Sequence, residues 1–336
     1  MMKRTLFIFL VVFLCRPLSY AQDGLIKKLI NNFVIQPDET RMTNCDSTFV
    51  GLPEYNWAFK INGIFSFSNF RIRFNGTPDC DYAIIKLGSG VSFKSSFSLA
   101  YKGLEAGYTF DQTNRYNRDF KFSSYGKRFG GEFQYQSYKD AKATIETHNP
   151  DSHLSYPNEY FNRMTINGYY VFNYKKFSYP AAITQTYNQL KPAGSFLLSA
   201  SVFYNKVKLF TDESDFAQVC NPTISLWQAS IGGGYGYNFL FFKNHLLFHL
   251  SAMPMVLFTI SERISGVLPD DYVKGDHKFS ISPSIVTRGS ICYTVRERLS
   301  LSLNVVYNRT SSNANSNINL YSNGWILNSS IGWRFF

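Results

Sequence analysis

The ten residues LSLSLNVVYN, positions 299–308, set the pattern that runs through the whole chain. An apolar or aromatic side chain stands at every odd position from 299 to 307, whereas serine or asparagine stands at 300, 302, 304 and 308. Successive side chains of a β-strand point to opposite faces of its sheet. The alternation therefore predicts a strand with one apolar face and one polar face.

The same alternation recurs along most of the 336-residue chain. It is found at 56–67, 85–93, 129–136, 164–174, 196–204 and 227–237. Helical periodicity is limited to 25–33, where an apolar face surrounds Lys27 and Lys28 and predicts a short amphipathic helix. Aromatic residues make up 18% of the chain and charged residues only 17%, a composition that excludes disorder.

A soluble β-sandwich and an outer-membrane β-barrel would both bury such strands, and three features favour the barrel: the strand lengths, the aromatic residues at strand ends and the lengths of the connections. Stretches such as 245–260 and 278–293 exceed the usual strand length of soluble sheets. Many segments also end in Tyr, Trp or Phe, as the aromatic girdles of membrane barrels do. We predict an all-β fold, a single antiparallel transmembrane barrel of about 12 strands over 56–336, with 10 or 14 strands as alternatives. A soluble periplasmic β-sandwich is the remaining alternative.

The connections between the predicted strands alternate in length, as in outer-membrane barrels. Counted from the C-terminus, 309–322 is long, 294–297 short, 261–277 long, 239–244 short and 211–224 long. The segment 175–194 breaks this rhythm; it contains Pro180 and Pro192, and we expect it to fold over one mouth of the barrel. Lys102-Gly103 is interpreted either as a hairpin turn or as a kink within a strand.

The N-terminus predicts export. Residues 1–21 have a basic start, an apolar run at 6–14 and a small-x-small ending at Ser19-Tyr20-Ala21, which together indicate a cleaved signal peptide. Cys15 offers a lipoprotein alternative, although Phe13 and Leu14 stand where lipoprotein signals have small residues. Residues 22–55 would form a periplasmic lead that contains the short helix. The predicted location is the outer membrane of a Gram-negative bacterium.

The last twelve residues, 325–336, alternate up to a terminal aromatic residue. They resemble the C-terminal strand that outer-membrane assembly machinery recognises, with Trp333, Phe335 and Phe336 as its aromatic residues. The Gly-Trp-Arg-Phe sequence at 332–335 is similar to the endings of Bacteroidota barrels.

Several local sequences taken together resemble one family. They are Thr48-Phe49-Val50, Trp57 at the start of an alternating strand, SLAYKGLE at 98–105, AGSFL at 193–197 and IGGGYG at 231–236. The chain is similar to a Bacteroidota outer-membrane β-barrel family carried as a domain of unknown function. The resemblance covers nearly all of the mature chain, implies a barrel and supplies no catalytic residues.

One triplet could carry chemistry. In His249-Leu250-Ser251 the spacing of two places both polar side chains on one strand face, within hydrogen-bonding reach. Barrel lipases and lipid A deacylases are similar in having His-x-Ser on a strand, but here Ala252-Met253 follows where those enzymes have Asn-Gly or Asn-Ala. The main hypothesis is that His249 and Ser251 are two polar residues that line a lumen. The alternative hypothesis is that they are catalytic.

The remaining chemistry is sparse. No His, Cys or carboxylate spacing matches a metal site, and the glycine run at 231–236 continues a strand and does not fit a nucleotide-binding loop, so no cofactor is expected. Cys45, Cys80, Cys220 and Cys292 remain after the signal peptide. If 56–67 and 70–74 form a hairpin, Cys45 and Cys80 lie on the same side of the membrane and could form a disulfide.

The net charge is +11, and export argues against a nucleic-acid partner. Basic residues suit lipopolysaccharide phosphates at the surface or an anion-favouring lumen. Candidates for that role are Lys60, Lys86, Lys94, Arg115, Arg118, Lys127 and Arg128. We therefore predict a non-enzymatic envelope protein or narrow pore, with outer-membrane lipids and the assembly machinery as partners and an unknown small-molecule ligand. A lipid-hydrolysing barrel is the alternative.

Overall fold

The computed structural model describes residues 42–77, 80–112, 117–147, 154–208, 223–265, 279–295, 297–315 and 318–335. The predicted signal peptide, the predicted helix at 25–33 and the terminal Phe336 lie outside these ranges. In the part of the chain that is described, no helix is both long enough and apolar enough to cross a membrane.

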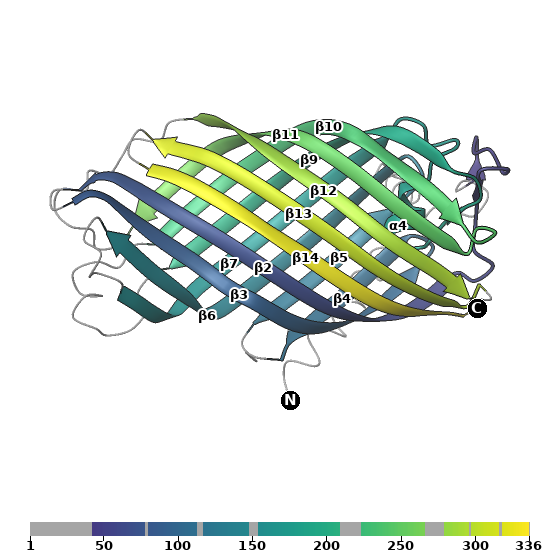
Figure 1. Cartoon of the computed structure of the whole chain (residues 1–336), viewed down its shortest axis with the longest axis horizontal. Coiled ribbons are helices and arrows are strands. Elements are labelled where there is room, and N and C mark those ends of the chain that lie inside the picture. Colours follow the sequence, from purple (N-terminus) through teal and green to yellow (C-terminus); the bar gives the residue numbers. More distant parts are fainter. Residues whose placement is uncertain are drawn as a thin grey trace, which may run out of the picture.

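Twelve strands of the described chain form one closed antiparallel barrel (Figure 1). Each strand pairs with its neighbours in chain order, and the last strand closes the ring by pairing with β2 from Ile318↔Phe74 to Phe335↔Trp57. The strands are β2 (Trp57–Thr77), β3 (Cys80–Tyr101), β4 (Leu104–Asp111), β5 (Arg118–Tyr125), β6 (Phe129–Thr147), β7 (Leu154–Val171), β9 (Ala193–Lys208), β10 (Thr223–Phe241), β11 (Leu246–Ser265), β12 (Ser280–Val295), β13 (Leu299–Asn315) and β14 (Ile318–Phe335). This confirms the predicted barrel, and the β-sandwich alternative is wrong because the sheet closes on itself.

The alternation seen in the sequence sorts side chains between the two faces of the wall. Leu301, Leu303 and Val305 are exposed on the outside, whereas Ser300 and Ser302 are buried on the lumen side. The same division holds on β2, where Phe59 and Ile61 point outward and Lys60 points inward. The barrel therefore has an apolar outer surface and a polar interior, the reverse of a soluble protein.

Two predictions about the wall need correction. Residues 57–77 form the single long strand β2, so 56–67 and 70–74 do not make a hairpin. The predicted long loop at 309–322 is also wrong, because β13 runs to Asn315 and β14 begins at Ile318. In both places polar residues such as Ser and Asn continue the ladder, since strands that extend beyond an apolar belt can carry polar side chains on both faces.

The number of strands in the wall changes along the barrel axis. β3 pairs with β4 from Lys94↔Asp111 to Tyr101↔Leu104, but its first half pairs directly with β6 from Ala83↔Thr147 to Gly88↔Lys142. The hairpin of β4 and β5 is thus inserted into one half of the wall only. Twelve strands surround the lumen at one end and ten at the other.

The end with twelve strands carries short connections at 102–103, 126–128 and 242–245, and we call it the turn mouth. Lys102-Gly103 proves to be the hairpin turn, with both residues at positive φ, 46° and 98°. Glycine is required at the second position because an added Cβ would lie 2.6 Å from the main-chain oxygen of Tyr125. The C-terminal residues of β14 end at the same mouth (Figure 1).

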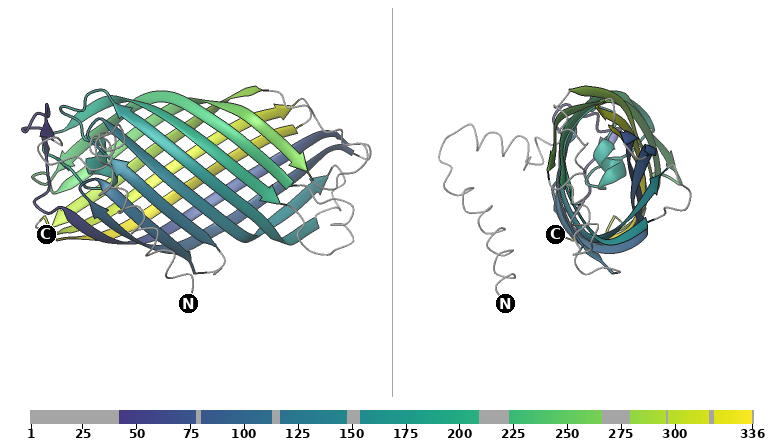
Figure 2. Two further views of the ribbon diagram at one scale, coloured as in Figure 1. Left: turned by 180° about the vertical axis from the view of Figure 1, so that it is seen from behind. Right: turned by 90° about the vertical axis from the view of Figure 1, so that its left-hand side faces the viewer.

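The segment 172–192 between β7 and β9 enters the turn mouth and fills it; we call it the plug. Its short helix α4 (Tyr179–Ile183) lies inside the ring of strands (Figure 2). Ser178 caps this helix by accepting a hydrogen bond from the Ala181 N–H, and Pro180 occupies its first turn, where no N–H is needed. The prediction that a proline-containing segment covers one mouth is confirmed, with the addition that the segment enters the lumen.

The N-terminal lead holds the plug from outside. β1 (Val50–Gly51) pairs with β8 (Asn188–Gln189), a two-stranded sheet separate from the barrel. The Leu190 N–H donates to the Phe49 oxygen at 2.7 Å, and the ammonium groups of Lys176 and Lys191 lie over the Phe49 ring. The lead and the plug therefore form one cap at the turn mouth.

Candidate functional site

The hairpin of β10 and β11 brings three polar side chains together on the lumen wall. Its turn at 242–245 pairs Asn238 with His249 and Gly236 with Ser251, so all four positions face inward. Nε2 of His249 lies 3.1 Å from Oγ of Ser251, and Nδ1 of His249 lies 2.7 Å from Oδ1 of Asn238. His249 is 0% exposed and Ser251 2% exposed, so this triad is sealed from solvent in the closed barrel.

The partners of Asn238 fix the direction of every hydrogen bond in the triad. Its Nδ2 donates to the Ser178 oxygen at 2.9 Å and to Oε1 of Gln189 at 3.0 Å, so its Oδ1 must be an acceptor. His249 then donates from Nδ1, and its Nε2 is left to accept the hydroxyl proton of Ser251. This is the arrangement of nucleophile, base and orienting group that serves nucleophilic catalysis.

Gly236 makes room for the triad. A Cβ at this position would lie 3.2 Å from Cε1 of His249 and 3.3 Å from Cβ of Ser251, closer than most side chains tolerate. Gly236 thus leaves space on the lumen face for the side chains of His249 and Ser251, a role that glycine within a strand often has.

A buried cation stands beside Ser251. Arg288 of β12 is its cross-strand partner, and Nη1 of Arg288 lies 3.4 Å from Oε1 of Glu132 on the opposite wall. Glu132 also accepts a hydrogen bond from the Tyr125 hydroxyl and pairs with Lys121 at 3.3 Å. Within the described chain, Nε of Arg288 is buried and has no hydrogen-bond partner. The guanidinium therefore keeps a donor that none of the described residues uses.

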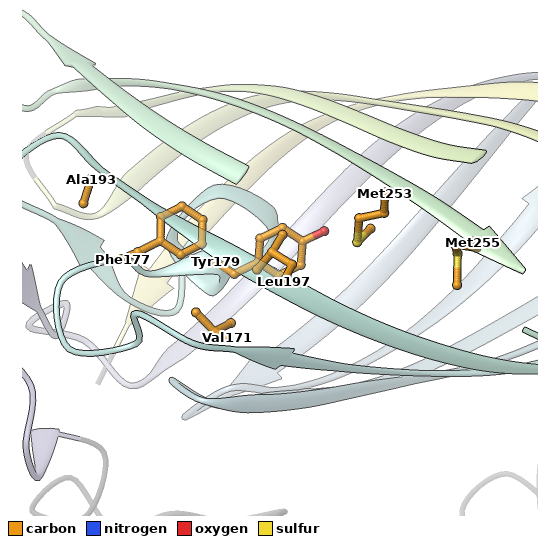
Figure 3. Close-up of a cluster of buried hydrophobic side chains, with 7 residues drawn as sticks. All are labelled: Val171, Phe177, Tyr179, Ala193, Leu197, Met253 and Met255. Carbon is orange, nitrogen blue, oxygen red and sulfur yellow. The ribbon is translucent and has the colours of Figure 1, made fainter. Parts of the chain in front are cut away.

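Two rings of the plug cover the triad. The Tyr179 ring meets the imidazole of His249 edge-on at 5.4 Å, and the Phe177 ring lies 6.1 Å from the same imidazole. These rings belong to a buried apolar cluster (Figure 3). Its members are Val171, Phe177, Tyr179, Ala193, Leu197, Met253 and Met255.

Main-chain atoms of the plug are tied to the wall by a separate set of hydrogen bonds. Nζ of Lys60 donates to the Thr184 oxygen at 2.9 Å, and Nη2 of Arg334 donates to the Gln185 oxygen at 2.7 Å. The Cys292 thiol donates to the Ala182 oxygen at 3.2 Å. These contacts come from β12, β14 and β2, which lie within one stretch of four consecutive strands of the wall.

The lead adds polar contacts outside the lumen. Nε2 of Gln189 donates to the oxygens of Phe49, Lys176 and Lys191, which joins the lead to both ends of the plug. Asp46 accepts hydrogen bonds from the hydroxyl and the N–H of Thr48, and these lower the pKa of its carboxyl.

The predicted disulfide between Cys45 and Cys80 is wrong. The Cys45 thiol lies near the turn mouth and donates to the Tyr174 oxygen, and burial raises its pKa. Cys80 begins β3 next to Thr77, at the opposite end of the barrel. The physical reason is the length of β2, which crosses the whole wall in one strand and carries the two cysteines apart.

The structure also places the other residues that the sequence singled out. His249 and Ser251 are hydrogen-bonded to each other, as the spacing of two required. Trp333 is exposed on the outer surface near the turn mouth and pairs with Phe59 of β2, and Phe335 pairs with Trp57. Their recognition by assembly machinery stays a prediction. Among the described residues, no group of three His, Cys, Asp or Glu side chains could hold a metal ion.

Sequence reasoning missed Asn238 and Arg288. It placed the short connection at 239–244, directly after Asn238, whereas the turn lies at 242–245 and Asn238 is within β10. A hairpin folded about 243 and 244 pairs residue 238 with 249, so the correct turn would have revealed the triad. For Arg288 no local signal exists, because its place beside Ser251 depends on the register between β11 and β12.

Comparisons with known proteins give a family and distant folds. The model of the domain of unknown function DUF4421 matches residues 44–335. Among curated proteins, none matches the chain in sequence.

Solved structures that resemble the chain include outer membrane protease OmpT from Escherichia coli, at 10% identity and TM-score 0.39, covering 84% of this chain and 97% of that one. Outer membrane protein OprG from Pseudomonas aeruginosa matches at 12% identity and TM-score 0.30, covering 85% and 98%. The translocator domain of autotransporter NalP from Neisseria meningitidis matches at 10% identity and TM-score 0.36, covering 83% and 88%.

Proposed function

The chain belongs to the DUF4421 family, a domain of unknown function, and we propose that it is an outer-membrane barrel that acts as a gated pore, closed by its plug. Polar solutes would pass through the lumen when the plug moves. The observation that carries this proposal is the way the plug is held. Inside the barrel, hydrogen bonds from wall side chains hold its main chain, and among the described residues its one strand pairing is the two-residue ladder with the lead.

The outer surface supports a membrane location. Exposed aromatic and aliphatic side chains surround the barrel, and an apolar surface of this extent is costly in water but stable in a bilayer. Members of this belt include Phe59, Ile61, Phe97, Leu99, Ile166, Phe196, Ile231, Leu250, Ile291 and Ile331. The signal peptide, the C-terminal assembly signal and the Bacteroidota origin suggested by the sequence stay part of this proposal.

The short connections support an orientation with the turn mouth toward the periplasm, because outer-membrane barrels keep their short turns there. The plug and the lead then close the periplasmic mouth, and the opposite mouth opens to the cell surface. Lipopolysaccharide would surround the surface end. The lumen lining supports passage of polar solutes, since Asn62, Lys94, Ser96 and Asp119 all face inward.

Ion conduction through purified protein in a planar bilayer tests the proposal. We expect the natural chain to be closed most of the time. Replacement of residues 179–187 by a short Gly-Ser linker between Ser178 and Asn188 should produce steady conductance, because it removes α4 from the lumen. A mobility shift between unheated and boiled samples on a gel would establish that the variant barrel is folded.

A matched control changes the same segment outside the lumen. Lys176 and Lys191 are exposed, and their ammonium groups lie over the Phe49 ring of the lead, so alanine at these positions keeps their main-chain contacts. Their double replacement by alanine should leave the pore closed. If the linker variant is folded and conducts no more than this control, the plug does not close a pore and the proposal is overturned.

A further inference from the structure

The triad, the unused guanidinium donor and the apolar wall beside them form a more complete chemical site than a pore requires. We propose that Ser251 is a masked nucleophile for acyl transfer from a carboxylic ester with an apolar acyl group, exposed when Tyr179 leaves the lumen wall. The proposal rests on the displaceable plug of the proposed function, because no substrate can reach Ser251 while the plug is seated.

Each catalytic role has a residue with suitable geometry. Ser251 supplies the nucleophile, and His249 accepts its proton through Nε2 across 3.1 Å. Asn238 is a positioning residue that holds Nδ1 of His249 at 2.7 Å and thereby fixes the tautomer. Asn238 is in turn held by Ser178 and Gln189, both of which belong to the plug.

The developing negative charge has a partner as well. Arg288 is directly across from Ser251 in the strand pairing, and its Nε is buried and unpartnered within the described chain. A carbonyl oxygen bound at Ser251 would offer that N–H an acceptor as it becomes an oxyanion. The Glu132 carboxylate occupies another nitrogen of the same guanidinium and keeps it in place.

The surrounding wall indicates the acyl group. Met253 and Met255 follow Ser251 at the next two inward positions of β11, and Leu197 of β9 belongs to the same buried cluster. Figure 3 shows these side chains in one row with Tyr179. An apolar chain can replace the Tyr179 ring against the methionines, whose flexible side chains adapt to different shapes.

The proposed reaction is ester hydrolysis in two steps, and water is the only co-reactant it needs. Oγ of Ser251 forms a bond to the ester carbonyl carbon while its proton passes to His249, and the alcohol leaves with that proton as the carbon–oxygen bond breaks. Water then attacks the acyl-serine, again through His249, and releases the carboxylic acid and the free serine. The net reaction is ester plus water to acid plus alcohol.

An alkyl fluorophosphonate tests the nucleophile directly, because serine displaces fluoride from it and the adduct is read by intact mass. Tyr179→Ala removes the ring and the hydroxyl over Ser251 but leaves the main-chain hydrogen bonds of the plug. We expect this variant to be labelled at least about tenfold faster than the natural chain, and adding His249→Gln should slow labelling by about a hundredfold.

Matched variants separate Ser251 from other serines. Ser251→Ala in the Tyr179→Ala background should abolish the adduct, whereas Ser290→Ala, at an equally buried serine of the next strand, should leave it unchanged. Asn238→Leu should lower the labelling rate and Asn238→Asp should restore it, with a changed pH profile, because an aspartate still accepts from His249. A merely structural Asn238 would not show that rescue.

The outcomes distinguish this proposal from the pore. If folded Tyr179→Ala protein is not labelled under conditions that label a soluble serine hydrolase, the proposal that Ser251 is a nucleophile is overturned. This conclusion does not depend on the bilayer recordings. Labelling that persists in Ser251→Ala would also overturn it. If Ser251 is labelled but the linker variant does not conduct, the result would support the nucleophilic role of Ser251 and overturn the proposed pore.

Discussion

Nζ of Lys60 on the barrel wall donates a 2.9 Å hydrogen bond to the main-chain oxygen of Thr184 in the plug, and the same nitrogen lies 2.8 Å from Oε2 of Glu105. One buried ammonium therefore joins a strand carboxylate to the segment that closes the mouth. Lys60 is almost fully buried, so water cannot take the place of either partner. Removal of its ammonium group therefore breaks both the hydrogen bond to Thr184 and the ion pair with Glu105.

Lys60→Met should both destabilise the barrel and loosen the plug. It leaves the Glu105 carboxylate buried without its cation, which costs on the order of 3 kcal/mol and lowers the urea midpoint of unfolding. Adding Glu105→Leu should recover most of that stability but not closure, because Thr184 still lacks its donor. Bilayer conductance and urea unfolding measured on both variants check this; a double variant as closed as the natural chain would contradict it.

Glu132→Gln should shift the ion selectivity of an opened pore toward anions. Glu132 is the carboxylate between Lys121 and Arg288, and its removal leaves two cations facing the lumen. The measurement is the reversal potential in a KCl gradient, using the Gly-Ser linker variant so that current flows. Asp46→Asn removes one carboxylate from the exposed lead and is the control; an equal shift in both variants would argue against a lumen effect.

The fold could be predicted from the sequence because its cause is local. Alternation such as that at 299–308 assigns each side chain to one face of its strand, and its recurrence in seven segments favours one large sheet that closes on itself. The plug could be predicted in outline, since 175–194 contains prolines and breaks the loop rhythm. What could not be predicted depends on register: the turn at 242–245 decides that Asn238 meets His249, and the pairing of β11 with β12 decides that Arg288 meets Ser251.

The cysteine pairing failed for a related reason. Ser68-Asn69, between the predicted strands 56–67 and 70–74, has the composition of a turn, yet it lies within β2. A strand that long moves Cys80 to the far end of the barrel from Cys45. How far a strand continues depends on whether its two neighbouring strands pair with it along its whole length. That pairing cannot be read from the sequence of the strand itself.

Gly103→Ala should destabilise the hairpin between β3 and β4. The residue has φ 98°, and the new Cβ would lie 2.6 Å from the Tyr125 oxygen, so strain and a main-chain clash act together. A loss of about 2 kcal/mol in urea unfolding is expected. Gly289→Ala is the matched control, because its Cβ would have only an ordinary contact of 3.9 Å with the His249 oxygen. Equal losses in both variants would mean that the turn is not the cause.

Ile61→Arg should reduce insertion of the barrel into lipid. Ile61 is 50% exposed on the outer face of β2, within the apolar belt, and a charge there costs about 2–4 kcal/mol near the bilayer midplane and less near its surfaces. The folded fraction of urea-denatured protein diluted into phosphatidylcholine vesicles, read as the heat-modifiable band on a gel, should fall accordingly. Phe242→Arg is the control, since Phe242 is 75% exposed in the turn at 242–245, where a charge can reach water. If both variants insert as well as the natural chain, the exposed belt does not face lipid.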